Sequence, residues 1–75
     1  MYKLSEFVKT RRNEVNLTQE EFAECAGVAL TVVRKIEQGK TNLNMDKVNL
    51  VLRMFGHTLA AVPLHAIDNQ NTKVQ

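Results

Sequence analysis

Apolar residues recur along the chain at intervals of three and four, in segments of which all but the first end at a glycine. Gly27, Gly39 and Gly56 close these segments, and glycine readily adopts the left-handed conformation that ends a helix. Intervals of three and four place side chains on one face of an α-helix. The pattern predicts successive amphipathic helices that share one core. The residues of the first three apolar stripes are Leu4, Phe7 and Val8; Phe22, Ala23 and Ala26; and Val32, Val33 and Ile36.

The second segment has a clear start. Thr18 is followed three residues later by Glu21, the capping-box spacing in which each side chain satisfies a free backbone donor of the first turn. We therefore expect a helix over about 18–26. Only residues 27–29 separate it from a helix expected over about 30–38, and so short a connection makes two helices cross steeply. These two segments predict a helix-turn-helix.

A fourth helix is expected over about 45–55, with polar residues on a narrow face only. Asp46, Asn49 and Arg53 form that face, and almost every other position is apolar. A single chain of this size can hardly cover so wide an apolar surface, which favours contact with a second copy. The alternative is a helix deep in its own core. The candidates for contact with a second copy are Leu50, Val51, Met54 and Phe55.

The segment after Gly56, HTLAAVPL, is short, apolar and ended by Pro63, which is typical of a strand. Because the chain shows no second strand, the same segment of another copy is the simplest partner, giving a two-stranded sheet across a homodimer. The alternative is an extended tail packed on the fourth helix. We expect a helix-turn-helix domain at 1–56, a dimerisation strand at 57–64 and a flexible tail at 65–75 that could serve in docking. Leu59, Ala61 and Val62 are the strand's interface candidates.

The composition fits one small folded domain. The chain has 75 residues, of which 44% are hydrophobic, and a net charge of +2. Domains of this size bury only about 60% of their unfolded surface, so a partner subunit would add stability. Cys25 is the single cysteine, which excludes an internal disulfide and is typical of a reduced cytoplasm. No apolar run is long enough for a membrane helix or a signal peptide, so we expect a cytoplasmic protein that does not contact membranes.

Enzymatic motifs are missing from the sequence. It holds no Gly-rich phosphate loop, no His and carboxylate at a useful spacing, and no nucleophile beside a base. The two histidines and Cys25 make no metal-ligand spacing. The sequence thus predicts a protein that is not an enzyme, with no catalytic residues, no metal, no cofactor and no small-molecule substrate.

The segment LTQEEFAECAGVALTVVRKIEQGKTN resembles the Xre family of helix-turn-helix transcription regulators. The resemblance covers about residues 4–56 and implies an all-α fold: a compact four-helix domain like that of lambda repressor. Within that family, LSEFVKTRR, NMDKVNLVLRMFG and HTLAAVP are most similar to antitoxins of the HipB type, which repress their own operon and bind a HipA-like kinase toxin. The alternatives are a phage-type or stand-alone Xre regulator, and a protein-interaction module in which DNA binding is secondary.

In a helix-turn-helix, the first turns of the second helix reach base edges in the major groove. Here those turns carry polar and basic side chains. Arg34 or Lys35 could donate to guanine, and Thr31 suits a thymine methyl or a polar contact. Ala29, Leu30, Thr31 and Lys35 match the family's base-reading positions, and Arg34 is added on its chemistry alone.

Contacts to phosphate are expected from helix N-termini and flanking donors. Gln19, Lys40 and Thr41 match family positions that hold the DNA backbone, and Asn42 and Asn44 are further candidates. Five cations against two carboxylates lie between residues 30 and 53, whereas the second helix is acidic. The basic charge therefore gathers where double-stranded DNA with a palindromic operator would bind, although each cation alone could be a solvated surface charge. The cations are Arg34, Lys35, Lys40, Lys47 and Arg53.

The resemblance also implies an ion pair between Arg12 and Glu37 that links the first helix to the end of the third. Glu37 is then a structural residue and not a catalytic acid. One position departs from the family pattern: Ala29 stands where Ser or Thr often caps the third helix, a deficit of about 1 kcal/mol in capping.

Overall fold

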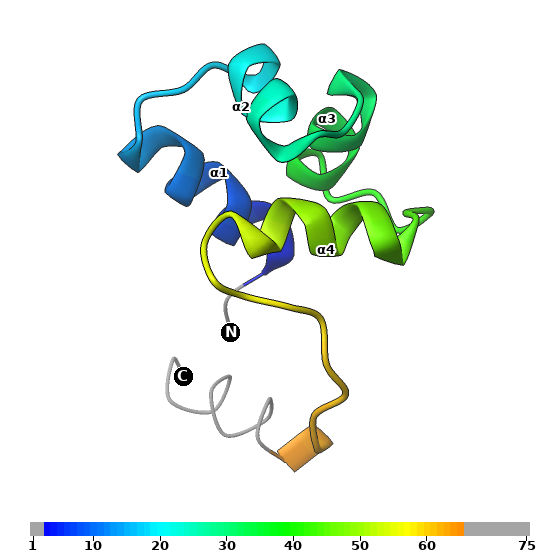
Figure 1. Ribbon diagram of the computed structural model, residues 1–75. Coiled ribbons are helices and arrows are strands. Elements are labelled where there is room, and N and C mark those ends of the chain that lie inside the picture. Colours follow the sequence, from blue (N-terminus) through cyan, green and yellow to red (C-terminus); the bar gives the residue numbers. More distant parts are fainter. Residues whose placement is uncertain (1–2, 66–75) are drawn as a thin grey trace.

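The computed structural model describes residues 3–65, which form four helices and no strand (Figure 1). The all-α fold and the helix-turn-helix are as predicted. The observed limits differ from the predicted ones by one or two residues, and α4 is followed by a turn over residues 54–56. The predicted flexible tail, 65–75, lies outside the described residues except for His65. The helices are α1 (Leu4–Glu14), α2 (Gln19–Ala26), α3 (Leu30–Glu37) and α4 (Met45–Arg53).

The helix-turn-helix begins and ends with local hydrogen bonds. Thr18 Oγ1 accepts from the Glu21 N–H at 3.1 Å, and the Thr18 N–H donates to Glu21 Oε1 at 2.9 Å. Both arms of the predicted capping box are therefore present. At the other end of α2, Gly27 has a φ of 76°, and this left-handed residue turns the chain into α3.

The core lies where all four helices meet. The helix α3 packs against α1, α2 and α4, and α4 runs across beneath α2 and α3 in the view of Figure 1. Within the described residues, no polar or charged residue is fully buried, so apolar burial is the main source of the stability of this domain. The buried residues are Val8, Phe22, Ala23, Val33, Ile36, Val48, Val51 and Leu52.

Much of the apolar surface of α4 and of the turn after it is used inside the domain. Val51 is fully buried. The Phe55 ring stacks on Phe22 with centroids 5.6 Å apart and meets Phe7 edge-on at 6.0 Å. Val51 is therefore excluded from contact with a second copy, and Phe55 retains only part of its surface for one. Met54 remains 38% exposed.

The predicted strand at 57–64 is not formed in the single chain. Residues 57–63 are without regular secondary structure, and Leu64 and His65 have helical backbone. A strand requires a ladder partner, and none is present among residues 3–65. Pairing with a second copy stays a prediction. No helix within residues 3–65 combines the length and the hydropathy that a membrane span requires.

Candidate nucleic-acid interface

The helix α3 has one buried and one open face. Val33 and Ile36 point into the core, whereas Thr31, Arg34 and Lys35 are exposed. Because α3 contacts the other three helices through its inner side, its outer side is left without cover in the described part of the chain. The open face is the one on which polar and basic side chains gather, so it is available to bases in a major groove.

At the N-terminus of α3, an exposed alanine is followed by a half-buried leucine. Ala29 is exposed and forms the N-cap, and its side chain makes no capping hydrogen bond. The Val32 N–H donates to the Ala29 carbonyl at 3.0 Å, so the N–H groups of Leu30 and Thr31 are the ones left for solvent or for an anion. Leu30 is half-buried and packs against the core. Of the five candidate base readers, Leu30 thus has the least free surface.

The connection between α3 and α4 carries most of the candidate phosphate contacts. Lys40, Thr41 and Asn42 are exposed and follow Gly39, which has a φ of 76°. Asn44 has a structural task, because its Oδ1 accepts from the Lys47 N–H at 3.1 Å and caps α4. The amide nitrogen of Asn44 is not used in that bond and could still reach a phosphate.

Arg12 and Glu37 form an ion pair that ties α1 to the end of α3. Arg12 Nε donates to Glu37 Oε2 at 2.7 Å and Arg12 Nη2 to Glu37 Oε1 at 3.1 Å. Only 12% of the Arg12 side chain and 5% of the Glu37 side chain are exposed. Arg12 Nη1 also donates to the Leu17 carbonyl at 2.7 Å, so one guanidinium holds α1, α3 and the segment before α2 together.

Gln19 joins this pair, which the sequence did not indicate. Its Nε2 donates to Glu37 Oε1 at 3.0 Å, and the side chain is half-buried. Gln19 and Glu37 lie on different helices, and no local pattern relates them. A phosphate contact from Gln19 would have to use its remaining amide hydrogen or its backbone N–H.

The network sets the charge states of both partners. Burial raises the pKa of Glu37, but the hydrogen bonds from Arg12 and Gln19 and the nearby positive charges outweigh this effect and lower the pKa below its ordinary value. The hydrogen bond from Arg12 to Glu37 raises the pKa of Arg12. The pair is therefore fully ionised at neutral pH.

This ionisation predicts that stability depends on acid through Glu37. A lowered pKa in the folded state means that the pair stabilises the fold above the unfolded pKa, about 4.3 for Glu, and that this contribution is lost as the pH falls through the folded value. The free energy of unfolding from urea titrations should fall below about pH 5. Glu37→Gln should weaken this dependence of the free energy of unfolding on pH. The control Glu14→Gln, at an exposed position, should leave it as in wild type. An unchanged slope in Glu37→Gln would contradict the assignment.

Comparison with known proteins agrees with this geometry. A helix-turn-helix family model matches residues 8–61. An uncharacterized HTH-type transcriptional regulator of Haemophilus influenzae is 31% identical over 55 residues, covering 73% of this chain and 56% of the relative. The chain thus spans little more than half the length of that relative.

A solved structure is similar over most of the fold. A toxin–antitoxin module from Streptococcus pneumoniae superimposes with a TM-score of 0.67 at 38% identity, covering 81% of this chain and 67% of that one. The family match includes α2, the turn, α3 and α4, and the open face of α3 carries the exposed polar and basic residues expected of a DNA reader. This chain belongs to the helix-turn-helix family of DNA-binding transcription regulators, of the Xre type.

Proposed function

We propose that this protein is the antitoxin of a toxin–antitoxin module, acting in the cytoplasm, where it represses its own operon and binds a HipA-like kinase toxin. The observation that carries the DNA-binding part is the uncovered outer face of α3, with Thr31, Arg34 and Lys35 exposed on it. The structural likeness to a toxin–antitoxin module over 81% of this chain supports the second part.

The proposed DNA contacts divide into two groups. Side chains at the start and along the open face of α3 read bases, and residues around it hold the backbone without reading sequence. Lys40 lies three residues after the end of α3, so its charge neutralises phosphate beside the groove that α3 enters. The proposed base readers are Ala29, Leu30, Thr31, Arg34 and Lys35, and the proposed phosphate contacts are Gln19, Lys40, Thr41, Asn42 and Asn44.

We further propose that the protein binds a palindromic operator as a homodimer. Exposed apolar side chains on α4 and on the segment after it support this, because a small domain rarely leaves several of them open to water. A twofold dimer would place its two α3 helices about 34 Å apart, or a multiple of that, on successive turns of the duplex. The proposed interface residues are Leu50, Met54, Phe55, Leu59, Ala61 and Val62.

Binding to the promoter of its own operon tests the DNA-binding part. Fluorescence anisotropy with that duplex should show tight binding that weakens log-linearly with salt, because each phosphate contact releases counterions. With six or more contacts in a dimer, affinity should fall about a thousandfold or more between about 50 and about 200 mM salt. A shuffled duplex is the control. Equal affinity for both duplexes would contradict a sequence-specific operator.

Co-expression with the neighbouring open reading frame tests the toxin part. A stable complex with a kinase-like product supports the antitoxin. Specific DNA binding without any complex would instead support a stand-alone or phage-type regulator. A complex together with weak, salt-insensitive DNA binding would support the protein-interaction module.

A further inference from the structure

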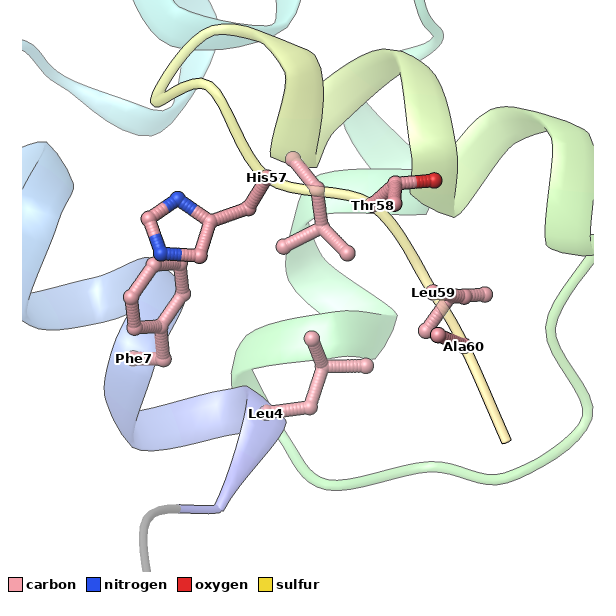
Figure 2. Close-up of a pocket in the computed structure, with 7 residues that line it drawn as sticks. Leu4, Phe7, His57, Thr58, Leu59 and Ala60 are labelled. Atoms are coloured by element: carbon pink, nitrogen blue, oxygen red, sulfur yellow. The ribbon is translucent and has the colours of Figure 1, made fainter. Parts of the chain in front are cut away.

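One side chain of α4 attaches the extended segment that follows the helix. Asn49 Oδ1 accepts from the Leu59 N–H at 2.8 Å and from the Thr58 hydroxyl at 3.1 Å. Figure 2 shows the segment passing beneath α4, with the His57 ring turned toward Phe7 and Leu59 further along the segment. The His57 ring lies 4.7 Å from the Phe7 ring, and its Nδ1 is 2.7 Å from the Phe55 carbonyl oxygen. The chain is thus held at two successive places after α4.

Apolar packing covers this segment only in part. Between the segment and α1 lies an open hollow of about 400 Å³, bordered by Leu4 and Phe7 on one side and by residues 57–60 on the other (Figure 2). Leu59 is 39% exposed and Val62 is 56% exposed. The hydrogen bonds of Asn49 therefore add to this partial packing and hold residues 58 and 59 along α4.

The attachment leaves one backbone edge of the segment free. In an extended chain, successive N–H and C=O groups point to opposite sides. Since the Leu59 N–H points to α4, the groups of Ala60 point away from it. The described part of the chain offers no hydrogen bond to the backbone of residues 60–62. A free edge of this kind is a template for pairing with another extended chain.

We propose that Asn49 is a positioning residue of the homodimer interface, which it sets up by holding residues 58 and 59 extended so that the outer edge meets the same segment of a second copy. This inference rests on the homodimer of the proposed function. Asn49 itself need not touch the partner. It replaces, within one chain, the neighbouring strand that would otherwise be needed to keep the segment straight.

Charge favours a second copy as the occupant of this edge. No Lys, Arg, Asp or Glu occurs between Arg53 and Asp68. When two copies of the segment pair across a twofold axis, each residue lies close to the same residue of the other copy or to one next to it. Like charges in such positions repel each other. An uncharged apolar segment avoids that repulsion, whereas a charged partner would find no opposite charge here.

The chemistry of the anchor distinguishes two substitutions. Asn49 uses only its carboxamide oxygen, as an acceptor of both hydrogen bonds. Asn49→Asp keeps an acceptor at this place, and Asn49→Ala removes it. Alanine is the better helix former and Asn49 is half-buried, so α4 itself tolerates both changes. Asn13→Ala, at an exposed asparagine of α1 with no side-chain hydrogen bond in the described structure, is the matched control.

Sedimentation equilibrium of the full chain tests the proposal. The dimer dissociation constant should rise about tenfold or more in Asn49→Ala, because each copy must then order residues 58 and 59 at the moment of pairing, without the two hydrogen bonds that hold them in the free chain. It should stay within about twofold of wild type in Asn49→Asp and in Asn13→Ala, each well below the tenfold change expected for loss of the anchor. Hydrogen exchange at the Leu59 amide should be faster in Asn49→Ala only.

The outcomes separate this proposal from the one it rests on. If the wild-type protein is monomeric at every concentration, the proposed homodimer itself is contradicted. A dimeric wild type with the same dissociation constant in Asn49→Ala overturns the anchor alone. So does an Asn49→Asp variant that loses the dimer while its Leu59 amide stays protected, because holding the segment would then not be what promotes pairing.

Discussion

Glu37→Gln should lower the free energy of unfolding by about 3 kcal/mol, the lower end for a buried pair that loses one partner. The change leaves the Arg12 charge in a place where only 12% of its side chain is exposed, and it weakens the hydrogen bonds from Arg12 and Gln19. For so small a domain, each kcal/mol shifts Tm by about 4–8 °C. Thermal unfolding followed by circular dichroism should therefore show a Tm lower by about 12–24 °C.

The exposed ion pair between Arg11 and Glu14 provides the control for this prediction. Its charged atoms are 3.5 Å apart, and 43% and 58% of the two side chains are exposed. Such pairs contribute about 0–1 kcal/mol, so Glu14→Gln should change Tm little. At temperatures where Glu37→Gln is folded, its order of preference among duplexes should match wild type. An altered preference with unchanged stability would make Glu37 a reader of DNA and not a structural residue.

Substitutions on and beside α3 should separate sequence reading from general affinity. Lys35→Ala should reduce the preference for operator over mutated operator by about 1–3 kcal/mol, the range for a bidentate base contact, and Thr31→Ala should reduce it by less, because its side chain makes a single polar or methyl contact. Lys40→Ala should weaken binding to all duplexes alike and reduce the salt slope by about one contact per subunit. Anisotropy titrations against operator and shuffled duplexes, at several salt concentrations, measure both quantities.

Arg53→Ala is the matched control for loss of charge. Arg53 lies in the last turn of α4, at the opposite end from the connection that carries Lys40. If position on the surface decides the effect, Arg53→Ala should change binding less than Lys40→Ala. Equal losses of affinity and of preference in Lys35→Ala, Thr31→Ala and Lys40→Ala would contradict the proposed division between base readers and phosphate contacts.

The structure also shows where sequence reasoning was limited. Thr18 and Glu21 predicted the start of α2 because a capping box involves residues three apart. The wide apolar face of the fourth helix does not predict what it packs against, since the same pattern suits a dimer surface and a domain core. The structure assigns Val51 to the core and the Phe55 ring largely to contacts with Phe22 and Phe7. Leu50 and Met54 keep surface that a second copy could cover.

Signals between neighbouring residues specify the helices, the start of α2 at Thr18 and its end at Gly27, and the polar side chains on one face of α3. Which distant groups meet depends on the packing of the domain. This packing brings Gln19 to Glu37 and places Asn49 against the backbone of Leu59. A helix start depends on residues within one turn of each other, whereas these contacts depend on how α1, α2, α3 and the chain after α4 pack, and no spacing along the sequence records that.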